Sequence, residues 1–308
     1  MKLAMVFPGQ GSQAVGMLKG YDGLPEIDSV RKEVSEVLGK DFLLLLDQGP
    51  AEKLNLTVNT QPAMVTAGYA AYRAWLGLGG PRPEMVAGHS LGEYTALVAA
   101  GALTFADCLP LVRFRAQAMQ EAVPEGQGAM AAILNLDDEL VKQACASAGG
   151  EVQAVNFNSP GQVVIAGEKA AVERAIEACK AAGAKRAIPL PVSAPFHSSL
   201  MKPAAERLAQ VLQKTNVSKT QMTLVNNVDV RVEREPQAVR DALARQAASP
   251  VRWVETINKM VAMGATHIVE CGPGKVLAGM TRRIAPNVVS LALADRAALE
   301  QALQGVKA

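Results

Sequence analysis

The sequence predicts an α/β fold in which a mainly parallel sheet, covered by helices, is interrupted by a smaller inserted subdomain. Short apolar segments alternate with longer helical stretches toward both ends of the chain, a pattern typical of a parallel sheet with helices on its faces. Residues 126–195 instead show closely spaced strand candidates. With 308 residues, the chain is long enough to bury the core of a large unit that carries such an insertion.

The large subdomain is expected to comprise residues 1–125 and 196–308. Its strand candidates are short apolar runs with the length of buried strands, at residues 3–7, 85–87, 222–225, 268–270 and 288–291. A helix is expected from residue 93 to residue 100, ending at Gly101. Clusters of glycine and proline at 124–128 and of proline at 189–195 mark the boundaries of the insertion.

The inserted subdomain, residues 126–195, contains a complete small pattern of its own. We expect strands at 128–134, 152–157, 162–166 and 185–192, with a turn at 158–161. Helices are expected at 138–148 and around Val172, Ile176 and Cys179, which share one helical face. The resulting order, β-α-β-β-α-β, is the ferredoxin-like arrangement.

Composition excludes several classes of function. The hydrophobic fraction of 49% and the charged fraction of 19% are ordinary for a globular protein. A net charge of +2 gives no general bias toward nucleic acid. No apolar run approaches the roughly 18 residues of a membrane span, and the apolar start before Pro8 is too short for a signal peptide. A cytoplasmic protein without nucleic-acid or membrane partners is therefore expected, and we expect it to be a monomer.

Cysteine and histidine usage argues against a metal site. The four cysteines are scattered without a C-x-x-C spacing, so we expect reduced, core-filling side chains. The three histidines have no ligand spacing between them. No metal is expected.

The segment Gly88-His89-Ser90-Leu91-Gly92 is the most informative motif of the chain. It matches G-x-S-x-G, the nucleophile elbow, in which a serine stands on a tight turn between a strand and a helix. The flanking glycines suit a turn that leaves no room for side chains. The alternative interpretation is a tight turn with an inert serine, since so short a pattern also arises by chance.

A serine nucleophile needs a base within hydrogen-bond reach, and three histidines compete for that role. His89 adjoins the serine, but neighbours on a turn project in different directions. His267 precedes an apolar strand and is interpreted as a residue of the strand end. His197 lies in the irregular segment 193–198, where the insertion returns to the large subdomain. Because catalytic groups concentrate on loops at such clefts, we predict His197.

Acyl transfer also needs donors for the developing oxyanion. In elbow enzymes one donor is the backbone N–H of the residue after the nucleophile, here Leu91. A glycine-rich loop after the first strand, residues 7–12, could supply the second. The alternative is that these glycines only turn the chain.

Four motifs in order, at residues 7–13, 88–94, 193–198 and 272–277, resemble those of malonyl-CoA:acyl carrier protein transacylases. The similarity extends from residue 3 to about residue 292. It implies an α/β-hydrolase-like large subdomain with a ferredoxin-like insertion, malonyl-CoA as substrate and acyl carrier protein as partner. It also implies that neither a metal nor a redox cofactor is needed.

The resemblance assigns roles to the reacting groups. Ser90 would carry the malonyl ester, and His197 would act as its base and then as its acid. The backbone N–H groups of Gln10 and Leu91 would form the oxyanion hole. Ping-pong transfer to the phosphopantetheine thiol of acyl carrier protein, supplying fatty acid elongation, is the function implied.

The resemblance also assigns supporting roles. Arg115 matches the arginine that binds the substrate carboxylate, which suits a planar guanidinium; Arg113 is the competing assignment. The backbone carbonyl of Gln246 would orient the imidazole in place of a carboxylate. Phe196 matches the malonyl-selective form of its motif and should disfavour branched extender units.

Two asparagines and three basic residues complete the predicted site. Asn156 and Asn158 match positions that touch coenzyme A, although polar residues near a turn also have an obvious local role. Lys185, Arg186 and Lys275 could form a docking patch for an acidic carrier protein, against the simpler interpretation of solvated charges.

Three other functions remain open at this point. A serine thioesterase or hydrolase would use the same elbow and release the acyl group to water. A degenerate, non-catalytic docking subunit would need a broken site, whereas Ser90, His197 and Arg115 are all present. A transacylase serving malonate decarboxylase or polyketide synthesis would differ only in its pathway.

Overall fold

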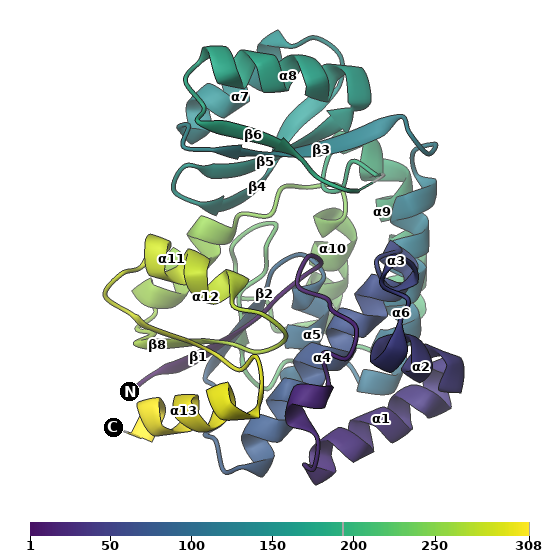
Figure 1. Cartoon of the computed structure of the whole chain (residues 1–308), viewed down its shortest axis with the longest axis vertical. Helices are drawn as coiled ribbons and strands as arrows, with labels where there is room; N and C mark the ends of the chain where they lie inside the picture. Colours follow the sequence, from purple (N-terminus) through teal and green to yellow (C-terminus); the bar gives the residue numbers. More distant parts are fainter. Residues whose placement is uncertain (193, 308) are drawn as a thin grey trace.

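The computed structural model describes residues 1–192 and 194–307, and it contains two separate sheets (Figure 1). Ser193, the first residue of the motif that carries His197, and Ala308 lie outside the described residues. The first sheet, sheet A, has the strand order β7-β2-β1-β8-β9, and the second, sheet B, has the order β4-β5-β3-β6. The predicted α/β fold with an inserted subdomain is confirmed.

Every strand pair of sheet A is parallel. Its strands are β1 (Leu3–Phe7), β2 (Met85–Gly88), β7 (Thr223–Leu224), β8 (His267–Glu270) and β9 (Val289–Ala292). All five residues of β1 are buried, which is why this strand consists of consecutive apolar residues instead of alternating apolar and polar ones. Each of these strands agrees with a predicted one to within a residue or two at its ends.

Helices cover both faces of sheet A. Leu3, Met5 and Phe7 face the larger core, which includes residues of α4 (Thr57–Gly77), α5 (Gly92–Ala99) and α6 (Phe105–Glu121). Ala4 and Val6 face the opposite core, formed with α11 (Trp253–Ala262) and α12 (Val276–Ile284). The alternation follows from the two-residue period of a strand. Among the described residues, no helix is both long and apolar enough to cross a membrane.

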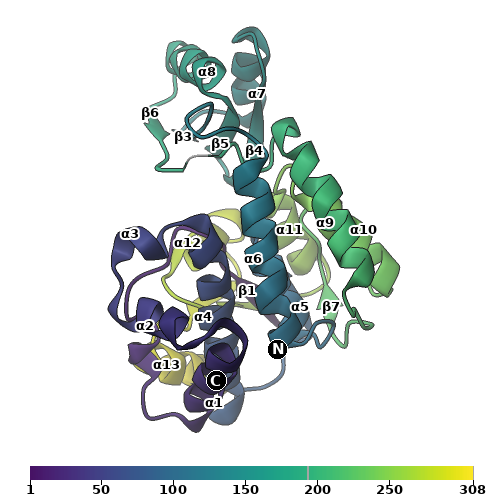
Figure 2. The same ribbon diagram turned by 90° about the vertical axis from the view of Figure 1, so that its right-hand side faces the viewer.

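The other helices of the large unit pack around this sandwich. They are α1 (Pro25–Leu38), α2 (Lys40–Gln48), α3 (Ala51–Leu54), α9 (Lys202–Lys214), α10 (Pro236–Gln246) and α13 (Arg296–Lys307), with short 3-10 helices at Lys19–Tyr21 and Ser199–Met201. The long helix α6 runs alongside the large unit and leads into the first strand of sheet B (Figure 2).

Sheet B is antiparallel throughout and lies at one end of the molecule (Figure 1). It comprises β3 (Gly128–Leu134), β4 (Val152–Ser159), β5 (Gln162–Glu168) and β6 (Arg186–Pro189), with α7 (Asp138–Ser147) and α8 (Lys169–Ala181) packed on one face. This is the predicted ferredoxin-like order. The precise division of the chain at residues 125/126 and 195/196 stays a prediction.

Two local expectations in sheet B are wrong. The strand expected at 185–192 is shorter, since β6 ends at Pro189. The turn predicted at 158–161 is shorter, because β4 continues to Ser159, which pairs with Gln162. Two irregularities in the register of β4 against β5, at Ala154/Asn156 and Phe157/Ser159, allow this continuation. Asn158 is therefore a buried strand residue and not a turn residue.

Candidate active site

Ser90 stands on a sharp turn between β2 and α5, at the carboxyl end of sheet A. Its φ of 51° lies in the left-handed region, where side chains are strained. A Cβ added at Gly88 would lie 1.8 Å from the carbonyl carbon of Gly92, and one added at Gly92 would lie 2.0 Å from the oxygen of Phe7. The two flanking glycines are thus required sterically, as the motif predicts.

The structure brings His197 to Ser90. The distance from Ser90 Oγ to His197 Nε2 is 2.6 Å, and His197 Nδ1 is 3.0 Å from the backbone oxygen of Gln246. Because a carbonyl oxygen can only accept, Nδ1 carries the proton, and Nε2 is left to accept the hydrogen bond from the Ser90 hydroxyl. The pair therefore has the tautomer that a general base needs.

The other two histidines take no part in this contact. His89 Nε2 is 2.7 Å from Asn158 Oδ1, so its ring turns away from the Ser90 hydroxyl. His267 is the first residue of β8 and contacts its neighbour Thr266. The choice of His197 on sequence grounds agrees with this geometry.

Burial keeps the imidazole of His197 neutral. Burial and then the nearby positive charge of Arg115 lower its pKa to about 3, although the hydrogen bond to the Gln246 carbonyl acts in the opposite direction. At neutral pH the ring is therefore free to accept a proton.

Arg115 of α6 is 2% exposed, and its guanidinium also lies beside Ser90. Its Nη2 donates to Ser90 Oγ at 3.2 Å and to Gln246 Oε1 at 3.0 Å, and its Nη1 donates to Gln61 Oε1 at 2.8 Å. Among the described residues, no carboxylate forms an ion pair with it. The hydrogen-bond partners of this buried guanidinium are thus neutral, although the carboxyl of Glu93 lies near enough to interact with its charge.

Arg113, the competing assignment, points elsewhere. Its guanidinium lies over the ring of Phe42, 5.3 Å from the ring centroid. Residues two apart on a helix face different directions, so only Arg115 lines the pocket that holds Ser90.

The predicted oxyanion donors lie at this pocket. Gln10 follows β1, Leu91 follows Ser90, and both line the same cavity as Ser90. Among the described residues, neither backbone N–H has a protein acceptor. The N–H of His89 donates to the Phe7 oxygen at 2.9 Å, which joins the elbow to the strand that precedes Gln10.

The cavity around Ser90 has a volume of about 130 Å³. Phe196 lines it, and sheet B and the chain that follows contribute Met130, Asn156, Leu190 and Val192. A neighbouring hollow of about 410 Å³ shares Gln10, Leu190, Val192 and Phe196 with it. A wider depression of about 570 Å³ lies between α7 and α11 and is not lined by Ser90.

The two asparagines assigned to coenzyme A differ in their surroundings. Asn156 lines the Ser90 cavity, and its buried Oδ1 has no hydrogen-bond partner among the described residues. Asn158 is 6% exposed, and its Oδ1 contacts His89. The structure therefore favours Asn156 over Asn158 as a substrate contact, because the Oδ1 of Asn158 already has a partner.

Three residues of the site received no role from the sequence. Gln61 holds Arg115, Asn227 Oδ1 accepts from the backbone N–H of Ser90 at 2.7 Å, and the buried carboxyl of Glu93 joins Asn227 to Gln246. Glu93 belongs to the family motif at residues 88–94, so the sequence indicated its position but not its role. Asn227 follows a strand of only two residues, which carries no periodic signal.

A serine and a histidine at the carboxyl end of a parallel sheet, with backbone donors beside them, form the arrangement of a serine-dependent acyl-transfer enzyme. In agreement, the family described as "Acyl transferase domain" matches residues 4–293.

Relatives with assigned names are more specific. The chain is 54% identical over 306 residues to the malonyl CoA-acyl carrier protein transacylase of Escherichia coli (strain K12), covering 98% of this chain and 99% of that protein. It is 46% identical over 310 residues to the protein of the same name from Bacillus subtilis (strain 168), covering 99% and 98%.

Solved structures agree. The crystal structure of acyl-carrier-protein S-malonyltransferase from Burkholderia pseudomallei 1710b has a TM-score of 0.97 and 58% identity, covering 99% of this chain and 100% of that one. A malonyl-transacylase in complex with its type II PKS acyl-carrier protein also has a TM-score of 0.97, with 51% identity over 99% of this chain and 100% of that one. The chain belongs to the family of malonyl CoA-acyl carrier protein transacylases.

Proposed function

We propose that this protein transfers malonyl from malonyl-CoA to the phosphopantetheine thiol of acyl carrier protein, through a malonyl ester on Ser90. The observation that carries the proposal is the buried guanidinium of Arg115, which lies 3.2 Å from Ser90 Oγ and has no carboxylate partner among the described residues. Buried charges are normally paired. The free carboxylate of a malonyl group could form a direct ion pair with this guanidinium, and an acetyl group could not.

In the first half-reaction, Ser90 Oγ attacks the thioester carbonyl carbon while His197 Nε2 takes the hydroxyl proton. The backbone N–H groups of Gln10 and Leu91 stabilise the oxyanion. When the carbon–sulfur bond breaks, His197 returns the proton to the sulfur and CoA leaves as a thiol. The malonyl group is then held on Ser90 as an ester.

The second half-reaction reverses these steps with a different thiol. The phosphopantetheine thiol of the carrier gives its proton to His197 and attacks the ester carbonyl. As the carbon–oxygen bond breaks, Ser90 Oγ recovers the proton. In this scheme the Gln246 carbonyl only orients the imidazole, and no metal or redox cofactor takes part.

The names of the relatives support both the substrate and the partner. Supply of malonyl units for fatty acid elongation, in the cytoplasm, is the biological role we propose. A similar solved structure is paired with a type II PKS acyl-carrier protein, so polyketide synthesis is the second candidate pathway. The exposed Lys185 and Arg186 lie on or beside β6, and the exposed Lys275 precedes α12; their role in docking stays a prediction.

The test is to mix the purified protein with malonyl-CoA, with and without holo acyl carrier protein. Intact mass should show a malonyl adduct on the wild type and none on Ser90→Ala, and the adduct should disappear as malonyl carrier forms. Rapid release of malonate without carrier would instead indicate a hydrolase. An unlabelled wild type would indicate a docking subunit. Comparing holo carriers from fatty acid and polyketide synthesis would separate the two pathways.

A further inference from the structure

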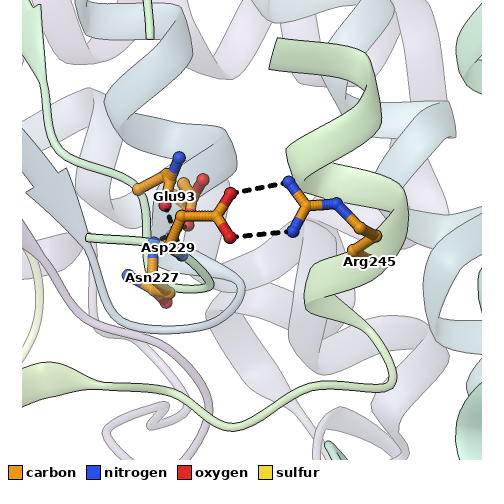
Figure 3. Close-up of polar contacts among 5 residues, drawn as sticks. Glu93, Asn227, Asp229 and Arg245 are labelled. Carbon is orange, nitrogen blue, oxygen red and sulfur yellow. Dashed lines mark hydrogen bonds and ion pairs between the residues drawn. The ribbon is translucent and has the colours of Figure 1, made fainter. Parts of the chain in front are cut away.

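A buried carboxyl lies behind the serine and histidine, where neither half-reaction uses it. Glu93 of α5 is 1% exposed. Its Oε2 accepts a hydrogen bond from the backbone N–H of Asn227 at 3.0 Å (Figure 3). The side-chain Nε2 of Gln246 donates to the same oxygen at 3.0 Å. The carboxyl therefore joins the loop after β7 to the end of α10.

Both partners of Glu93 hold the elbow. Asn227 Oδ1 accepts from the N–H of Ser90 at 2.7 Å, and Asn227 Nδ2 donates to the oxygen of Gly88 at 2.7 Å. Gln246 Nε2, besides contacting Glu93, donates to the backbone oxygen of Ser90 at 3.0 Å. The backbone N–H and the backbone oxygen of Ser90 are thus both hydrogen-bonded to residues that Glu93 connects.

The same network reaches the imidazole and the guanidinium. The backbone oxygen of Gln246 holds His197 Nδ1 at 3.0 Å, and its side-chain Oε1 accepts from Arg115 at 3.0 Å. A shift of Gln246 would therefore move the histidine ring and the guanidinium together, relative to Ser90.

A partly exposed ion pair connects the same two segments, the end of α10 and the loop after β7. Arg245, which precedes Gln246, points at Asp229, and its two terminal nitrogens lie 2.9 and 2.6 Å from the two carboxylate oxygens (Figure 3). Asp229 follows Asn227 on the loop after β7. A bidentate pair of this kind fixes orientation as well as distance, although its partly exposed position limits its contribution to stability.

The charge of Glu93 depends on its surroundings. Burial raises its pKa to about 7, while the Asn227 and Gln246 donors and the positive charge of Arg115 on α6 act in the opposite direction. Asp229 raises the pKa slightly, and the buried Tyr94 is its titratable neighbour on α5. The ionised carboxylate accepts the two N–H groups more strongly than the neutral acid does.

We propose that Glu93 is a positioning residue, whose carboxyl holds Asn227 and Gln246 so that Ser90 and His197 stay at reacting distance. This inference rests on the proposed function, because its readout is the formation of the malonyl-Ser90 ester. It assigns the glutamate no contact with substrate. It predicts that the acylation rate rises with pH through the pKa of Glu93, well above the pKa of His197.

The experiment compares wild type, Glu93→Gln and Glu270→Gln. Glu270 of β8 is a matched control, since it is also buried, burial also raises its pKa to about 7, and it accepts instead from the N–H of Ala278 in α12. Single-turnover acylation by malonyl-CoA is followed between about pH 5.5 and pH 8.5, together with the thermal midpoint of each protein.

Glu93→Gln should lower the acylation rate roughly 10- to 100-fold, the scale expected for a small misplacement of reacting groups. The malonyl-CoA concentration that gives half the maximal acylation rate should change less than about threefold, because Glu93 itself makes no contact with substrate. The rise in rate near pH 7 should disappear. Glu270→Gln should keep the wild-type rate and pH profile even if its thermal midpoint falls as far.

Glu93→Asp, which keeps the acid and shortens its reach, is measured in parallel and takes the place of Glu93→Gln if that variant does not fold. The same loss of rate is expected. A Glu93 variant with the wild-type rate and pH profile would overturn the inference, as would an equal loss of rate in Glu270→Gln. A wild type that forms no ester at all would instead contradict the proposed function.

Discussion

The two sheets contribute different things to the site. Two of the proposed reacting parts follow strands of sheet A, because Gln10 comes after β1 and Ser90 comes directly after β2, whereas His197 lies on the chain that leaves β6 of sheet B. Sheet B and the chain leaving it contribute Met130, Asn156 and Leu190 to the walls of the cavity. In a parallel sheet all carboxyl ends meet at one edge, whereas in an antiparallel sheet they alternate. The parallel sheet can therefore gather the nucleophile and an oxyanion donor at one edge, whereas sheet B contributes cavity walls and the chain leaving it brings His197 to Ser90.

The largest effects are expected at Ser90 and His197, which meet at the carboxyl edge of sheet A. Ser90→Ala and His197→Ala should each lower malonyl transfer by roughly 10⁴-fold or more, as for other serine–histidine enzymes. Steady-state transfer to holo acyl carrier protein measures the loss, and intact mass shows whether the adduct forms. An adduct that persists in Ser90→Ala would show that another residue is the nucleophile. The role assigned to the edge of sheet A would then be wrong.

Arg115→Ala should lower malonyl transfer by roughly 10²- to 10³-fold, since a desolvated charge pair is lost. Transfer of acetyl from acetyl-CoA should fall much less, because acetyl has no carboxylate. Arg113→Ala is the matched control and should leave both activities near those of the wild type. Equal losses for the two acyl groups would mean that Arg115 does not bind the carboxylate.

The turns of the two sheets should differ in their tolerance of a methyl group. A Cβ at Gly92 would meet the Phe7 oxygen at 2.0 Å, so Gly92→Ala should lower the free energy of unfolding by about 3 kcal/mol or more. Gly161, in the turn between β4 and β5, has a φ of 71° and no atom nearer than 3.5 Å to such a Cβ. Gly161→Ala should cost only about 1–2 kcal/mol, the penalty for a left-handed residue.

Urea denaturation of both variants measures this difference. A Gly92→Ala protein as stable as Gly161→Ala would show that the elbow can relax, and the steric argument for its glycines would be lost.

The smallest effect is expected on substrate selection. Phe196→Ala should raise the relative kcat/KM for methylmalonyl-CoA about tenfold, since one methyl group is worth about 1–3 kcal/mol in a close-fitting pocket. Competition between malonyl-CoA and methylmalonyl-CoA measures the ratio. If the ratio does not change, the aromatic ring that lines the cavity does not set the selectivity.

Much of the fold was predictable because its signals are local. The apolar run of β1 reflects burial on both faces, and the β-α-β-β-α-β order of sheet B follows from short periodic segments. The end of β4 was not predictable, because a register irregularity against β5 decided it. The elbow at Ser90 was predictable for the same reason, because the steric crowding that requires its glycines arises within five consecutive residues.

By itself, the sequence determined the strands of sheet A, the elbow and the choice of His197. The Glu93–Asn227–Gln246 network was decided only by the tertiary structure. Asn227 and Gln246 lie more than 130 residues from the elbow they hold. Asn227 follows β7 and Gln246 ends α10, and the pattern of neither element says anything about Ser90. Steric and periodic rules act between near neighbours along the chain, whereas a buried hydrogen bond between distant residues depends on how whole elements pack.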